Sequence, residues 1–160
     1  MIRPRSSLLF SAFFLPVAAE ATFSINFNFN GGLTTSQQAV FNEAKATWES
    51  YITGYQSGFT QTGINITATG SSSDGVGGSA GPTSAAFQGG YWLARDGSMN
   101  FDSADLADME SNGILDELIT HEIGRVPDIG TLWDEDWNAV YINGTGQYTG
   151  AFALDAYRDE

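Results

Sequence analysis

The residues best suited to chemistry lie in the segment LITHEIGRVPDIGTLWD, residues 118–134. It contains His121, the only histidine in a chain without cysteine, directly followed by Glu122. An imidazole can bind a divalent metal ion, and a neighbouring carboxylate can take a proton from metal-bound water. Residues four apart share one face of a helix, so a second ligand would be expected at position 125. That position holds Arg125, whose guanidinium stays protonated and has no lone pair for a metal.

A helix from residue 114 to about residue 126 is predicted to carry these side chains. Its apolar residues recur at helical spacing and should pack inward: Ile114, Leu115, Leu118, Ile119 and Ile123. His121 and Glu122 are then delivered to one side of the helix. Arg125 follows Glu122 at the i to i+3 spacing, so we expect an ion pair that occupies the carboxylate.

The first half of the chain predicts two strands and a long helix. TFSINFNFN alternates apolar and polar residues, as a half-buried strand does, with Phe23, Ile25, Phe27 and Phe29 on one face. Thr34 and Thr35 stand three residues before Gln37 and Gln38, which is the spacing of a helix start. A stripe of residues at helical spacing follows: Phe41, Ala44, Trp48 and either Tyr51 or Ile52. Gly54 and Gly58 should end that helix, and GINITATG forms the second strand. Residues 70–82, rich in glycine and serine, predict a surface loop.

The second half predicts a hairpin and an acidic helix before the helix that carries His121. Asp96-Gly97 has the composition of a tight turn between two strands. Asp102 or Ser103 should cap the acidic helix, where Asp102, Asp105 and Asp108 form a solvated face rather than a calcium loop. Beyond residue 139 we expect a short strand, a turn at Asn143-Gly144 and a last helix begun by Thr149. This order of elements is typical of an α+β fold.

Length and charge limit the classes of function. The chain has 160 residues, 42% of them hydrophobic, which suits one domain with its own core. It has 19 acidic against 6 basic residues, for a formal net charge of -13. Binding to nucleic acid or to an anionic membrane surface requires clustered cations, so both partners are excluded. The acidity serves solubility or, alternatively, calcium binding.

Residues 1–21 have the organisation of a secretory signal peptide. Two arginines precede an apolar run over residues 8–17, and Ala19-Glu20-Ala21 forms a small-x-small cleavage motif. The alternative, a membrane anchor, needs about 20 apolar residues, and this run is shorter and contains Pro16. We therefore expect a mature chain from Thr22 that is secreted, extracellular or periplasmic, with no membrane association after cleavage. Without cysteine, it folds without disulfides.

Several segments together resemble the metzincin zinc metallopeptidases, specifically secreted leishmanolysin-like proteases whose members read close to HEIGHVLGIGTLW. The other matching stretches are FNFNGGLTTSQQAVFNEAKATWESYITGY, DGVGG…GPT, MNFDSADLADMESNG and YINGTGQYTGAFALDAYR. The resemblance assigns residues 22–160 to a metzincin-like catalytic subdomain, with a small twisted sheet, a packing helix and an active-site helix. It implies proteolysis by zinc-activated water on a protein or peptide substrate. His121 would be the first zinc ligand and Glu122 the general base.

The chain departs from that pattern at three neighbouring positions. Arg125 replaces the second zinc ligand, Pro127 a leucine and Asp128 a glycine, each by one base substitution. Pro127 falls where the helix is already ending, so it should be tolerated. The third zinc ligand, a histidine expected further on, is absent, so the domain is interpreted as incomplete at its C-terminal end. We therefore expect an enzyme of this family that is inactive as written.

Alternative interpretations remain open at the level of the sequence. Carboxylates near His121 could build an improvised zinc site: Glu117, Asp128, Asp134, Glu135 and Asp136. The same frame could be a non-catalytic secreted module that binds a peptide or partner along the former cleft. A third reading, an acidic structural protein of an envelope or matrix, depends on composition alone. The clustering of the departures within four residues favours a decayed peptidase over a repurposed one.

Overall fold

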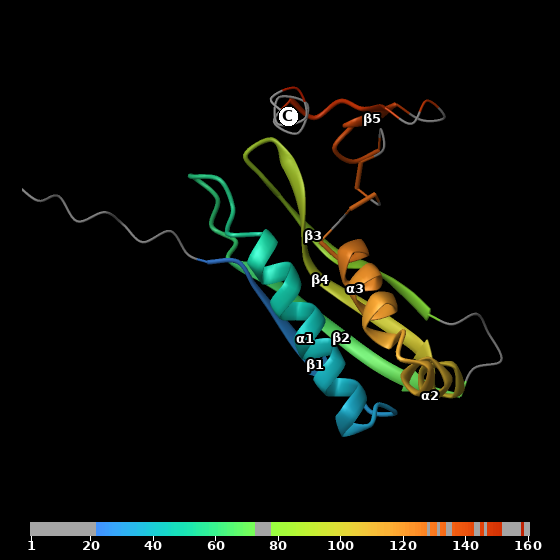
Figure 1. The fold of residues 1–160 in the computed structure, drawn as a ribbon. Helices are drawn as coiled ribbons and strands as arrows, with labels where there is room; N and C mark the ends of the chain where they lie inside the picture. The colour runs from blue at the N-terminus through green and yellow to red at the C-terminus, as the bar shows by residue number, and fades with distance from the viewer. Residues whose placement is uncertain are drawn as a thin grey trace, which may run out of the picture.

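Figure 1 shows the computed structural model, which describes residues 22–72, 78–127, 129–130, 132–133, 136–142, 145, 147–151 and 158. The predicted signal peptide, residues 1–21, lies outside the described residues. The elements are β1 (Ser24–Phe29), α1 (Thr35–Tyr51), β2 (Gly63–Ser71), β3 (Gly78–Gln88), β4 (Tyr91–Asp102), α2 (Ser103–Asn112), α3 (Leu115–Arg125), β5 (Tyr141–Ile142) and β6 (Gln147–Tyr148). The predicted α+β class is confirmed.

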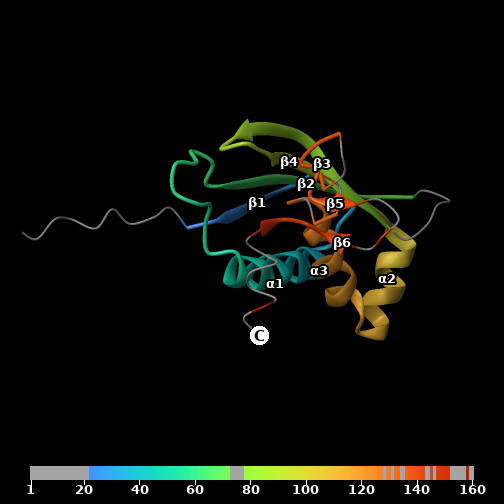
Figure 2. The same cartoon turned by 90° about the horizontal axis from the view of Figure 1, so that it is seen from above.

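The main sheet has four strands in the order β1-β2-β4-β3. The pairs β1–β2 and β2–β4 are parallel, and the edge strand β3 is antiparallel to β4. Figure 2 shows α1 and α3 side by side on the same side of this sheet, with α2 beyond its end. Strands β5 and β6 form a separate antiparallel hairpin. The helix of interest, α3, therefore packs beside α1 on one face of the sheet.

The core lies between the helices and the sheet. Phe41 of α1 meets Phe27 and Phe101 edge to face, with ring centroids 5.4 and 5.6 Å apart. From α3 come the buried side chains of Leu115, Ile119 and Ile123, as predicted. Ile114 was expected to join them but is 47% exposed, because it precedes the first helical turn as the N-cap residue. The other face of the sheet is polar and exposed at Asn26, Asn28, Asn65 and Asn100.

Helix α1 begins with a capping box at Thr34 and Gln37, one of the predicted pairs. The hydroxyl of Thr34 accepts from the Gln37 backbone N–H at 3.2 Å, and the Gln37 side chain accepts from the Thr34 N–H at 3.0 Å. This reciprocal pair starts α1. The helix ends at Tyr51, three residues before the predicted Gly54, because Ile52 is already extended. Ile52 packs against the core, whereas Tyr51 is 75% exposed.

The acidic helix α2 begins as expected but does not present all three aspartates to solvent. Asp102 is buried and accepts from the Ala104 N–H at 2.7 Å, so it is the N-cap rather than part of a solvated face. Asp105 is half-buried and Asp108 is exposed. The solvated-face prediction therefore applies to Asp108 alone.

The hairpin predicted at Asp96-Gly97 is wrong, because both residues lie inside β4. The turn is Gly89-Gly90, with φ of +58° and +91°, between the paired residues Gln88 and Tyr91. Glycine is needed at position 97 for close packing rather than for a turn, because a Cβ there would lie 2.2 Å from Cγ1 of Val126. Its missing side chain lets the end of α3 approach the sheet.

The surface loop predicted over residues 70–82 is largely strand. β2 continues to Ser71 and β3 starts at Gly78, and residues 73–77 lie outside the described residues. Small residues can form this strand because the backbone of β3 pairs with β4. Pro82 lies on the edge strand at a register shift, a position where its missing N–H is tolerated.

The C-terminal part contains the predicted short strand as β5, paired with β6. The predicted turn residues Asn143 and Gly144 lie outside the described residues, as do residues 152–157 of the predicted last helix. Within the described part of the chain, no helix has the length and apolarity to cross a bilayer.

Candidate functional site

Helix α3 is fixed against α1 by one glycine and one tryptophan. A Cβ at Gly124 would lie 2.7 Å from Cζ2 of Trp48, so only glycine permits this approach. The indole N–H of Trp48 donates to the Thr120 carbonyl at 2.8 Å. The apolar face of α3 faces the sheet, so its opposite face, with His121 and Arg125, points outward.

His121, Glu122 and Arg125 form one cluster on that face. Arg125 Nε lies 3.6 Å from Glu122 Oε2, so the predicted ion pair is confirmed. The same Nε–H donates to His121 Nε2 at 3.4 Å, and His121 Nε2 lies 4.0 Å from Glu122 Oε1. The side chains of His121 and Arg125 are 64% and 54% exposed, whereas that of Glu122 is 10% exposed. The guanidinium therefore engages both the would-be ligand and the would-be base.

A cavity of about 550 Å³ opens beside the cluster. It is lined by Trp48, His121, Gly124, Arg125, Ile129 and Gly130. The chain closes around it after α3, where the Ile129 N–H donates to the Gly124 carbonyl at 3.1 Å. Pro127 follows the end of the helix at Arg125, as predicted, so it interrupts no helical turn.

Among the described residues of this cluster, the side chains that could bind zinc are those of His121 and Glu122. Four-coordinate zinc needs several nitrogen, sulfur or carboxylate ligands, and no group of three such side chains occurs in the part of the chain that the structure describes. The Nε2 lone pair of His121 points at a protonated guanidinium instead. Of the carboxylates considered for an improvised site, Glu117 and Asp136 are exposed, and Asp128, Asp134 and Glu135 lie outside the described residues.

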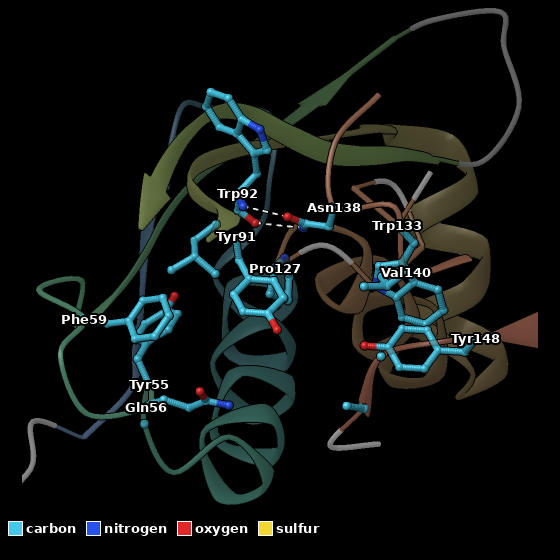
Figure 3. A pocket seen from close by; sticks show the side chains of 14 residues that line it. Tyr55, Gln56, Phe59, Tyr91, Trp92, Pro127, Trp133, Asn138, Val140 and Tyr148 are labelled. Carbon is cyan, nitrogen blue, oxygen red and sulfur yellow. Dashed lines mark hydrogen bonds between the residues drawn. The ribbon is translucent and has the colours of Figure 1, made fainter. Parts of the chain in front are cut away.

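A second cavity, which we did not predict, lies at the N-terminal end of β4 (Figure 3). It measures about 360 Å³ and is dominated by aromatic rings from three parts of the chain: Tyr55 and Phe59, Tyr91, and Trp133 and Tyr148. These residues are far apart in the sequence and follow no period, so pattern reasoning cannot group them. The only sequence signal was the aromatic content of 13%.

Two side-chain amides complete the backbone pairing of β4 next to this cavity. Beyond the region paired with β2, Asn138 accepts from the Trp92 N–H at 2.6 Å and donates to the Trp92 carbonyl at 3.0 Å. Gln61 donates to the Ala94 carbonyl. These amides replace the strand that is missing on that side, which satisfies backbone groups that would otherwise be unpaired.

Tyr55 connects this amide network to the cavity wall. Its hydroxyl accepts from Gln61 Nε2 at 2.8 Å, and its ring meets Phe23 edge to face at 5.8 Å. Burial raises the pKa of Tyr55 above its usual value, and the hydrogen bond from Gln61 offsets part of that rise. Tyr55 is therefore neutral at physiological pH.

Comparisons with known protein families, with curated proteins and with solved structures returned no match to this chain.

Proposed function

We propose that the chain is a secreted protein built on the frame of a metzincin-like, leishmanolysin-like zinc endopeptidase, and that it is catalytically impaired as written. The α+β sheet with one packing helix, α1, and one helix bearing His121 and Glu122, α3, agrees with the frame that the resemblance implies. A peptide or protein would be the ligand of the cleft beside α3.

One observation carries the proposal: His121 and position 125 share the outward face of a helix that borders a cavity, and the nearly buried Glu122 carboxylate lies within 4.0 Å of both side chains. With histidine at position 125, two imidazoles would lie one turn apart on that face, which is the spacing that holds a zinc ion. Gly124 lets this helix pack closely on Trp48 and brings position 125 to the cavity.

The same geometry explains the impairment. Arg125 places a positive charge within hydrogen-bond distance of the ligand atom of His121. A four-ligand zinc site is worth roughly 10–16 kcal/mol, so one ligand, given a quarter, binds only near the millimolar range. The Glu122 carboxylate is held by Arg125 rather than left to accept a proton from water.

The alternative function is a non-catalytic secreted module that binds a peptide on the same frame. It is favoured by the ion pair between Glu122 and Arg125, because this pair satisfies the Glu122 carboxylate without a metal. The clustering of the departures at residues 125–128 favours loss of catalysis in a peptidase instead.

Zinc content after dialysis against micromolar Zn²⁺ tests the proposal, with the unmodified protein compared with Arg125→His. The control is Arg95→His, which adds a histidine at an exposed strand position far from α3 in the sequence. We expect little zinc in the unmodified protein, a clear gain in Arg125→His and none in Arg95→His. Stoichiometric zinc in the unmodified protein would contradict the predicted impairment. No gain in Arg125→His would leave the binding module as the better account.

A further inference from the structure

The aromatic cavity has two walls, each built from a pair of rings. Tyr55 and Phe59, from the connection between α1 and β2, stack with centroids 6.4 Å apart and an interplanar angle of 25°. Trp133 and Tyr148, from the C-terminal part, lie 4.8 Å apart. Tyr91 lies between these walls in Figure 3. A ligand that enters the cavity therefore meets ring faces on several sides.

This cavity is separate from the one beside His121. The two cavities have no lining residue in common. In the chain after α3, Pro127 lines the aromatic cavity and Ile129 lines the other. Binding at the aromatic cavity therefore requires neither His121 nor a metal.

None of the described residues that line the cavity is charged, although the chain has a formal net charge of -13. In Figure 3 the hydroxyls of Tyr91 and Tyr148 and the side-chain amide of Gln56 point toward the space between the walls. The amide of Asn138 is taken by the Trp92 backbone. The cavity thus offers ring faces and a small number of hydrogen-bond donors.

Ring faces combined with hydroxyl and amide donors suit one class of peptide ligand. A proline-rich segment has apolar rings and no proline N–H, and it needs only donors for its carbonyl groups. It is extended before binding, so it loses little conformational entropy, and aromatic-lined grooves are a recurrent way to recognise it.

We propose that the cavity bounded by Tyr55, Phe59, Tyr91, Trp133 and Tyr148 binds a proline-rich, extended segment of another protein. Prolines pack between the two ring pairs, and Tyr91 and Gln56 donate to the peptide carbonyls. Basic residues flank the prolines in the preferred partner, because the strongly acidic chain attracts cations.

Fluorescence anisotropy with a dye-labelled proline-rich peptide that has a lysine at each end tests this site, with a chelator present. We expect saturable binding that is lost when alanines replace the prolines. Tyr91→Ala should weaken binding about tenfold, because aromatic residues at the centre of a contact dominate affinity. Tyr91→Phe removes only the hydroxyl and should weaken it several-fold. Tyr51→Ala is the matched control, since this ring is 75% exposed and outside the cavity.

Three results would each overturn the proposal. The first is the absence of saturable binding by the proline peptide. The second is equal binding of the alanine peptide, which would show that the rings do not select proline. The third is an affinity of Tyr91→Ala for the proline peptide that equals the affinity of Tyr51→Ala. In the first case, binding of an oligosaccharide or a quaternary ammonium salt would identify the class of ligand that the cavity takes instead. Because the assay contains a chelator, its outcome is independent of whether Arg125→His gains zinc.

Discussion

Arg125 Nε lies 3.6 Å from Glu122 Oε2, one helical turn apart on α3. The two partners differ in environment, because the Glu122 side chain is 10% exposed and that of Arg125 is 54% exposed. A carboxylate with so little water around it needs a nearby cation or hydrogen-bond donors. Arg125, at the position where the sequence pattern leads one to expect a second zinc ligand, thus compensates the charge of Glu122.

Arg125→Ala should lower the free energy of unfolding by about 1 kcal/mol. It leaves the Glu122 carboxylate nearly buried without its cation, but the exposure of Arg125 to solvent limits the loss. Urea denaturation of the protein and of the variant measures the difference. In a Glu122→Gln background the same substitution should cost much less, because no charge is left uncompensated. An equal loss in both backgrounds would show that Arg125 acts through packing of its aliphatic stem.

Asn138→Ala should release the C-terminal part from β4. Asn138 supplies both hydrogen bonds to the Trp92 backbone, which precedes the part of β4 that pairs with β2, and each bond is worth about 0.5–1.5 kcal/mol. We expect hydrogen exchange at the Trp92 amide to accelerate by about tenfold or more, measured by NMR. Asn42→Ala is the control, because Asn42 bonds only to the Gln38 carbonyl on an exposed helix face. Unchanged protection of the Trp92 amide would mean that its hydrogen bond to Asn138 is not what protects it from exchange.

Gly97→Ala should destabilise the protein by about 1–3 kcal/mol, the usual range for overpacking. The added Cβ would lie 2.2 Å from Cγ1 of Val126, so the end of α3 must move away from the sheet. Gly81→Ala is a matched control on the neighbouring strand, since a Cβ there meets nothing within 4 Å. Thermal unfolding compares the two. If both variants have the same melting temperature, the close approach of Val126 does not constrain α3.

The sequence predicted the features that depend on neighbouring residues. The sequence narrowed the cap of α1 to Thr34 or Thr35 and that of α2 to Asp102 or Ser103, and the structure has Thr34 and Asp102. These caps and the ion pair of Glu122 with Arg125 join residues two or three positions apart. Such contacts follow from helix geometry alone. The buried stripe of α3 was predicted for the same reason.

Features set by distant contacts were not predictable. Gly97 looked like a turn residue, because a glycine signals either a positive φ or a close approach, and only the position of Val126 distinguishes them. The sequence of β3 does not alternate apolar and polar residues. It therefore gave no signal for the pairing of β3 with β4. The aromatic cavity brings together Tyr55, Tyr91 and Tyr148 from three separate segments.

Asp96 should make a small contribution to the stability of the fold that is lost in acid. The hydroxyl of Ser84 donates to Asp96 Oδ2 at 2.5 Å and the Asn65 amide donates to Oδ1 at 3.0 Å, and these bonds hold the pKa of Asp96 below its ordinary 3.8. The folded-state pKa is lowered, so the stabilisation is present above about pH 4 and is lost as the pH falls through the folded-state pKa. Ser84→Ala should raise the Asp96 pKa in an NMR titration, whereas Asp108→Asn, on α2, should leave it unchanged. An Asp96 pKa that stays low in Ser84→Ala would assign the effect to Asn65 instead of the Ser84 hydroxyl.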